Sequence, residues 1–309
     1  MLNEMFFILA GSLITLAVCL GAGYIGRKLG IITDAINTGM SGLLVKITMP
    51  CMVFISMMQP FSQELLIESV STVLFSGAVF LAGYFIALAL GWIMRASDSE
   101  KRIWQFSLLA PNAGFMGFPV VYSVYGHEGM FYASMSLLGF NLLIFSLGLY
   151  IFKKGGTDIK ATIKSIAFTP VLIATYIGLV FFVTGLRLPI HIHNGIRMIG
   201  DMSITLAMVI MGAVLAKDKL RTVANDPRII PVLVARLIII PVVAVFALRP
   251  FVHNPMMLGV IVLSGAMPVA IITVIFAEQY NCDASMATKL ITISSILCLF
   301  TIPMISLVM

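Results

Sequence analysis

Long apolar runs alternate with short polar connections along the whole chain. Each run reaches about 20 residues, which is the length that an α-helix needs to cross the hydrocarbon core of a bilayer. We therefore expect ten membrane-spanning helices, numbered in order, at residues 5–25, 36–58, 68–93, 103–125, 129–152, 167–186, 196–216, 229–248, 256–278 and 285–307. The predicted fold class is an all-α membrane protein.

Basic residues are distributed unequally between the connections. If the N-terminus lies outside, the cytoplasmic side receives fourteen of them, namely Arg27, Lys28, Arg95, Lys101, Arg102, Lys153, Lys154, Lys160, Lys164, Lys217, Lys219, Arg221, Arg228 and Lys289. The external connections contain Arg187, Arg197 and Arg249. Because cytoplasmic loops of membrane proteins are enriched in Lys and Arg, this pattern predicts a multi-pass protein of the bacterial inner membrane with both termini outside.

Composition agrees with a bilayer as the solvent. Hydrophobic residues make up 60% of the 309 positions and charged residues 10%, whereas a soluble domain has about 25% charged residues. The net charge of +6 is spread over many short connections, so binding to nucleic acid is not expected. The cysteines form no CxxC motif and are interpreted as packing residues. We therefore expect neither a metal nor a cofactor.

The longest basic connection, residues 153–166, divides the expected helices into two sets of five. We interpret it as a cytoplasmic linker between a first repeat at residues 1–152 and a second repeat at residues 167–309. An odd number of helices in each half gives the two halves opposite orientations in the membrane. The sequence therefore predicts two inverted five-helix repeats.

Helix-breaking residues crowd the centres of helices four and nine. They are Pro111, Asn112, Gly114, Gly117 and Pro119 in the first, and Ser264, Gly265 and Pro268 in the second. Proline removes a backbone donor and clashes with the preceding turn, so one interpretation is a pair of discontinuous helices that cross near the membrane centre. Each break would expose a helix N-terminus suited to an anion, and carbonyl groups suited to a proton donor or cation. The alternative is an ordinary proline kink.

The helix-four segment APNAGFMGFPV resembles the Asn-x-Gly-Phe-x-Gly-x-Pro motif of the auxin efflux carrier family. This family includes plant PIN carriers and bacterial malate and malonate permeases. The motif residues are Asn112, Gly114, Phe115, Gly117 and Pro119. The flanking segments KITMPCMVF and DMSITLAMVIMGAVL are also similar, although many relatives carry a proline where this chain has Thr205 or Leu206.

The resemblance implies an architecture like that of NhaA and the bile-acid symporters, with broken crossover helices four and nine. It implies a scaffold of helices 1, 2, 6 and 7, and a moving transport domain of helices 3–5 and 8–10. Substrate would bind beside the crossover, and the protein would form a homodimer.

Four charged residues of the expected spans are candidates for a role in the membrane: Lys46, Asp201, Arg236 and Glu278. A charge at the bilayer centre costs about 2.5–3.5 kcal/mol on insertion scales, so each needs an explanation. Lys46 and Asp201 occupy matching positions in the two halves and could form a pair that binds the anion or couples a proton, or only an ion pair of the scaffold. Arg236 is expected to extend to the cytoplasmic interface, and Glu278 to lie at the cytoplasmic mouth.

These observations predict a secondary-active carrier of small organic anions such as mono- or dicarboxylates, with an elevator-like movement of the crossover domain. The chain has no P-loop, which disfavours a primary pump. The coupling ion could be a proton or sodium, and a sodium-coupled symporter resembling the bile-acid carriers is the main alternative, followed by a channel. An enzyme or intramembrane sensor is disfavoured because all the histidines, His127, His191, His193 and His253, fall in expected external connections.

Overall fold

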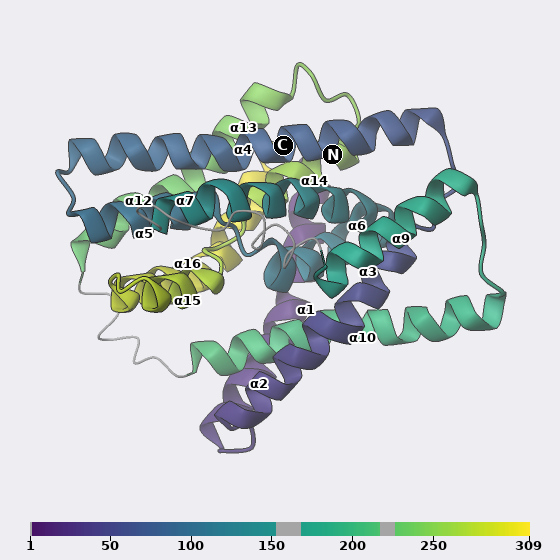
Figure 1. The fold of residues 1–309 in the computed structure, drawn as a ribbon, viewed down its shortest axis with the longest axis horizontal. Helices are drawn as coiled ribbons and strands as arrows, with labels where there is room; N and C mark the ends of the chain where they lie inside the picture. The colour runs from purple at the N-terminus through teal and green to yellow at the C-terminus, as the bar shows by residue number, and fades with distance from the viewer. Residues whose placement is uncertain (1, 153–167, 217–225) are drawn as a thin grey trace.

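The structure is a computed structural model that describes residues 2–152, 168–216 and 226–309 (Figure 1). The expected linker at 153–166 lies outside the described residues. The helices longer than ten residues are α1 (Leu2–Lys28), α4 (Gln63–Ile93), α5 (Asp98–Leu109), α6 (Phe118–Leu143), α9 (Pro170–Thr184), α10 (Ile190–Leu215), α14 (Pro255–Ala266) and α16 (Ala284–Ser306). The shorter α-helices are α2 (Asp34–Leu43), α3 (Met49–Met57), α7 (Leu149–Phe152), α12 (Ile230–Val234), α13 (Ile240–Leu248) and α15 (Ile272–Gln279).

Seven stretches of the described chain are long and apolar enough to cross a membrane: Leu9–Lys28, Asp34–Met57, Gln63–Ile93, Ala113–Phe152, Ile190–Leu215, Pro227–Leu248 and Ala284–Ser306. The prediction of an all-α membrane protein is therefore confirmed. The arrangement as ten spans in two inverted repeats stays a prediction.

Turns of π-helix widen several spans just before a proline. They lie at Leu44–Thr48, Ala113–Gly117 and Ala235–Ile239, and Pro50, Pro119 and Pro241 follow them as the second residues of α3, α6 and α13. Proline has no N–H to donate and its ring crowds the carbonyl four residues earlier, so the preceding turn expands instead of breaking. The chain therefore stays helical through Pro119, and the interruption expected in helix four is confined to residues 110–112, between α5 and the turn that begins at Ala113.

Gly126 bends α6 into two arms. Its backbone angles are φ 60° and ψ −150°, a conformation that essentially only glycine adopts. The arm before Gly126 belongs to expected helix four, and the arm after it belongs to expected helix five. The turn joins the two apolar arms through the short polar stretch of His127 and Glu128.

The most extensive helix–helix contacts fall into two groups (Figure 1), and further contacts of α1 with α6 and α16, and of α3 with α6, link the groups. In one group α1 runs against α10, and α3 packs on both α9 and α10; in the other, α4 packs on α5, α6 and α14. The α1–α10 contact is close enough that a Cβ at Gly212 would lie 1.9 Å from the Leu20 carbonyl oxygen. Small residues of this kind let membrane helices approach each other's backbone.

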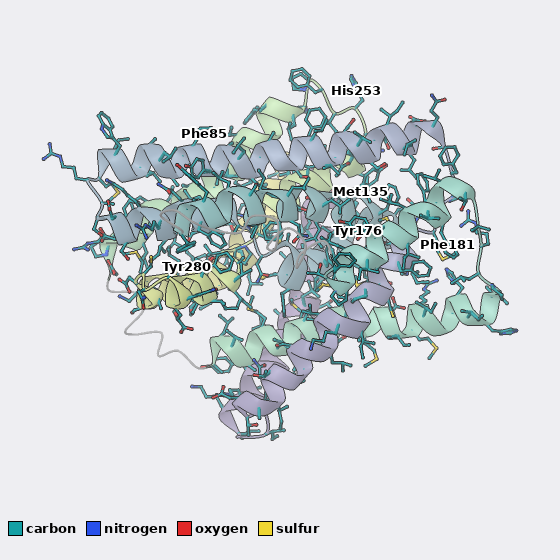
Figure 2. All side chains as sticks on the ribbon, viewed as in Figure 1. Phe85, Met135, Tyr176, Phe181, His253 and Tyr280 are labelled. Atoms are coloured by element: carbon teal, nitrogen blue, oxygen red, sulfur yellow. The ribbon has the colours of Figure 1, made fainter. Side chains whose placement is uncertain are left out.

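Large apolar side chains cover the outside of the helices (Figure 2). Trp92, Tyr150 and Phe85 are 82%, 75% and 58% exposed. In water such a surface would be unfavourable, but hydrocarbon chains can cover it without a cost in free energy. The exterior therefore agrees with a protein surrounded by lipid.

Candidate crossover site

The two helix interruptions meet and pair with each other. We call residues 110–112, after α5, and residues 267–271, after α14, the crossover. Asn112 N donates to Pro268 O at 2.8 Å, and Ala270 N donates to Ala110 O at 3.0 Å, which forms an antiparallel bridge between Pro111 and Val269. Each interruption thus supplies hydrogen-bond partners for the other, as irregular backbone at membrane depth requires.

Neighbouring groups pair with further backbone groups of the crossover. The Val269 N–H donates to Ser294 Oγ of α16 at 3.0 Å. The Asn112 carbonyl accepts from Gly117 N at 3.0 Å and Met116 N at 3.2 Å. These bonds matter because a buried backbone group without a partner costs about 1–3 kcal/mol.

Unlike these backbone groups, the Asn112 side-chain amide forms no hydrogen bond through its Nδ2 within the described chain. Asn112 is 4% exposed, and its Nδ2 has no hydrogen-bond partner among the described residues. It stands at the N-cap position of the helix that begins at Ala113, yet its side chain does not cap that helix. A buried amide donor therefore lies unused beside a helix N-terminus.

The other motif residues lie around this N-terminus in different environments. Gly114 is half-buried, and the nearest atom to a Cβ at this position would be the Met49 methyl group of α3 at 3.8 Å. Gly117 is buried, and its Cβ would approach Met267 Cγ at 3.3 Å. Phe115 is half-buried and Pro119 is buried. One side of the motif thus faces α3, and the other side faces the second interruption.

Of the residues expected at the second interruption, Ser264, Gly265 and Pro268 are all buried. Ser264 and Gly265 belong to the last turn of α14, and a Cβ at Gly265 would lie 2.9 Å from Val79 Cγ1 of α4. Pro268 contributes its carbonyl to the bridge with Asn112. The structure therefore brings Pro268 to the helix-four motif and leaves Ser264 and Gly265 packed within α14.

Arg236 lies at the crossover, and the expectation that it extends to the interface is wrong. Its side chain is fully buried. Nε donates to the Met267 carbonyl at 2.9 Å and Nη1 to the Leu108 carbonyl at 2.8 Å. These carbonyls belong to the C-terminal ends of α14 and α5, which attract a cation. An arginine in the middle of the apolar run 229–248 was the sequence signal for this position.

Lys46 and Asp201 do not form the pair that their matching positions suggested. Asp201 Oδ2 lies 3.8 Å from Arg197 Nε, and Oδ1 lies 3.9 Å from His127 Nε2. Lys46 is exposed in the π-turn. The close approach of α3 and α10 is at Met52 and Gly200, so Lys46 lies six residues, about 9 Å of helical rise, from the level of Asp201.

Glu278 is exposed in α15 and is remote from the bridge. His127 is less solvated than an external loop predicts, because its side chain is 23% exposed and its Nε2 lies 3.3 Å from the Tyr122 hydroxyl. His127 thus joins the end of helix four to Asp201 of α10. No sequence motif pointed to this contact, which depends on how α6 turns at Gly126.

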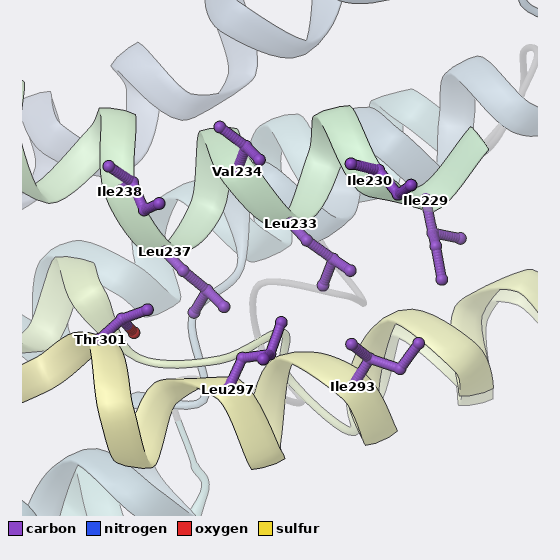
Figure 3. Close-up of a pocket in the computed structure, with 9 residues that line it drawn as sticks. All are labelled: Ile229, Ile230, Leu233, Val234, Leu237, Ile238, Ile293, Leu297 and Thr301. Carbon is purple, nitrogen blue, oxygen red and sulfur yellow. The ribbon is translucent and has the colours of Figure 1, made fainter. Parts of the chain in front are cut away.

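Two further features lie apart from the crossover. A cavity of about 230 Å³ is lined in part by Tyr132 and Asn254, and both side chains donate to the carboxylate of Glu68. A groove of about 300 Å³ is lined by Ile229, Ile230, Leu233, Val234, Leu237, Ile238, Ile293, Leu297 and Thr301 (Figure 3). The groove has a single polar side chain, and Ile230 and Ile238 at its rim are 56% and 49% exposed, so it suits lipid better than an anion.

Comparison with known proteins agrees with a membrane transporter. The model of a family described as membrane transport protein matches residues 8–306, nearly the whole chain. The chain belongs to this family, the auxin efflux carrier family. The prediction made from the helix-four motif is therefore confirmed, and the family is one of transporters rather than enzymes.

Full-length relatives carry only general descriptions. An uncharacterized transporter of Methanothermobacter thermautotrophicus is 26% identical over 93% of this chain and 94% of its own length. One from Methanocaldococcus jannaschii is 24% identical over 91% and 92%. The uncharacterized transporter YfdV of Escherichia coli is 22% identical over 97% and 96%. The protein is thus similar to transporters along its entire length, and none of these names specifies a substrate.

Proposed function

We propose that this family member is a secondary-active carrier of small organic anions, with its substrate site at the crossover. The observation that carries the proposal is the unpartnered Asn112 amide beside two paired helix interruptions. A carboxylate is a hydrogen-bond acceptor with two oxygens, so it can accept from this amide and from the free N–H groups of a helix N-terminus.

Helix ends supply an electrostatic reason for an anion. The helix that begins at Ala113 and the helix α15 that begins at Ile272 both start at the crossover. Each N-terminus carries about half a positive charge, so the two together balance one carboxylate. Neither start has a side-chain cap. In α15, Thr273 N and Val274 N already donate to Ala270 O and Ile271 O, so the helix that begins at Ala113 offers the larger number of N–H groups to a ligand.

Packing supports an elevator-type movement. Asn112, Pro111 and Pro268 are buried, so substrate can reach or leave the crossover only if helices move. The group of α1, α2, α3, α9 and α10 corresponds to the scaffold of helices 1, 2, 6 and 7. The remaining helices correspond to a transport domain of helices 3–5 and 8–10, and Gly114 faces Met49 at the boundary between the two groups.

Contacts between loop ends support the proposed topology of ten spans with both termini outside the inner membrane. Residues assigned to the cytoplasm lie together, as in the ion pairs Glu100–Arg228 and Asp226–Lys289. Residues assigned to the exterior do the same, as in the cluster of Glu68, Tyr132 and Asn254. A homodimer formed through the scaffold is part of the proposal on the ground of family membership.

The direct test is counterflow in proteoliposomes with radiolabelled malonate, malate and a monocarboxylate. We expect saturable exchange of at least one carboxylate by the unchanged protein, and a loss of at least tenfold in Asn112→Ala. Asn141→Ala is the matched control, because the Asn141 amide bonds within its own helix to the Leu137 carbonyl. Exchange of no carboxylate, or equal exchange by Asn112→Ala, contradicts the proposal, and flux without saturation or counterflow indicates a channel.

A further inference from the structure

Arg236 carries a charge at the crossover without a carboxylate partner. The elements that pack against its π-turn include α4, α5, α14 and α16. Two of these, α14 and α16, contain no acidic residue. The carboxylates of α4 and α5 lie in their first two turns, and Glu100 is eight residues, about 12 Å of rise, from Leu108. No described acidic side chain pairs with this guanidinium.

The helix C-termini replace the missing carboxylate. Arg236 donates to Leu108 O and Met267 O, the carbonyl ends of α5 and α14. Each such end carries about half a negative charge, so the two ends together balance one guanidinium. In transporters with broken helices, these carbonyl ends are where a coupling sodium ion or proton is held.

We propose that Arg236 is a built-in cation that occupies the sodium position of the crossover. With the carbonyl ends neutralised, the free helix N-termini and the Asn112 amide leave a positive field that selects an anion. The carrier then needs no bound sodium ion at this place. This inference rests on the proposed function, because it assigns the ion dependence of the same site.

The surroundings hold the guanidinium in this position. A Cβ at Gly83 of α4 would lie 2.1 Å from the Leu108 carbonyl oxygen, so only glycine lets α4 pack against this carbonyl while it accepts from Arg236. Arg236 lies in the π-turn Ala235–Ile239, just before Pro241. The third nitrogen, Nη2, has no partner among the described groups, so a donor remains for a ligand that arrives at the crossover.

Sodium-specific thermal unfolding tests the inference without a transport assay. The unchanged protein, Arg236→Lys and Arg236→Gln are unfolded in detergent in 300 mM NaCl and in N-methylglucamine chloride of equal ionic strength. We expect no sodium-specific shift for the unchanged protein or Arg236→Lys. Arg236→Gln leaves the carbonyl ends without a cation, so sodium should raise its unfolding temperature by roughly 2–4 °C.

The outcomes separate this inference from the proposed function. A sodium-specific rise in the unchanged protein overturns the role of Arg236 even if Arg236→Gln cannot be purified, and carboxylate exchange can still succeed in that case. A folded Arg236→Gln without any sodium response also overturns it. Failure of all carboxylate exchange, with the expected sodium responses intact, instead contradicts the proposed function. Arg197→Gln, a change outside the crossover, is the control and should show no sodium response.

Discussion

At the scale of single residues, the crossover combines buried polar groups that have hydrogen-bond partners with one that has none among the described residues. Ser294 has a definite task, since its hydroxyl accepts the Val269 N–H. Asn112 Nδ2, equally buried, has no partner in the described chain. Natural proteins retain such a cost where binding or movement requires it. Stability and transport should therefore respond differently to changes at these two positions.

Removal of the Ser294 hydroxyl should lower stability, and removal of the Asn112 amide should not. Ser294→Ala leaves the Val269 N–H without a partner and should destabilise the protein by about 1–3 kcal/mol. Asn112→Ala removes a donor that has no partner, so its unfolding temperature should equal or exceed that of the unchanged protein. Thermal unfolding in detergent measures both. A large stability loss in Asn112→Ala would show that its amide is already satisfied.

Close packing at Gly83 gives a second prediction at this scale. In Gly83→Ala the new methyl group meets the Leu108 carbonyl oxygen at 2.1 Å, and overpacking of this kind costs about 1–3 kcal/mol. We expect a lower unfolding temperature and reduced exchange. Gly77→Ala is the matched control, because Gly77 lies in the same helix and nothing lies within 4 Å of its new Cβ. Equal behaviour of the two variants would contradict the close packing.

At the scale of elements, the ends and interruptions of helices are built by local rules. The start of α5 has a capping box between Ser97 and Glu100, and Glu100 also pairs with Arg228, which lies in the short turn Pro227–Ile229 before α12. The hydrogen bond from the Ser97 backbone N–H is the largest effect that lowers the pKa of Glu100, and Arg228 adds to it. The charged carboxylate therefore stabilises this junction.

The sign of the Glu100 effect predicts a pH dependence. A carboxyl group whose pKa is lowered by folding stabilises the protein above its unfolded pKa, and this stability is lost as the pH falls through the folded pKa. Glu100→Gln should thus unfold at a lower temperature than the unchanged protein at pH 7. The difference should shrink below pH 4.5, the ordinary pKa of this group. A difference that stays constant between pH 7 and pH 3 would rule out the charge as its cause.

At the scale of the whole molecule, the two groups of helices meet across a boundary that several hydrogen bonds of the described residues cross. One of these hydrogen bonds joins Ser56 Oγ of α3 to Ser134 Oγ of α6 at 3.3 Å, and both residues are fully buried. An elevator movement has to separate this pair, because the residues belong to different groups. The distance between them therefore reports on the movement.

A reversible cross-link tests that movement. In a background without the native cysteines, Ser56→Cys with Ser134→Cys should form a disulfide on oxidation and lose exchange, because the two groups can no longer slide. Reduction should restore exchange, and each single cysteine should remain active after oxidation. Full activity of the cross-linked protein, with the disulfide verified by mass spectrometry, would contradict an elevator mechanism.

Much of the element-level architecture follows from the sequence because its causes are local. Apolar length alone predicts helices that cross a bilayer. The proline and glycine residues near Pro111 and Pro268 predict helix interruptions whatever tertiary fold the chain adopts. Pro119 shows the limit of that reasoning. It stands in a motif rich in helix breakers, yet the helix continues. The π-turn Ala113–Gly117 before it is wider than an α-helical turn and accommodates the proline, which has no N–H to donate.

The sequence by itself therefore determined the membrane environment, the helical class, the family and the two interruptions. Only the tertiary structure decided how the interruptions pair, that Arg236 joins their carbonyl ends, and that Asp201 lies beside His127 and Arg197 instead of Lys46. Each of these contacts except Arg197–Asp201 joins segments far apart in the chain, so its existence depends on helix crossing points and on the register between helices. Side-chain packing between helices decides the crossing points and the register, and neither can be predicted from a local pattern of residues.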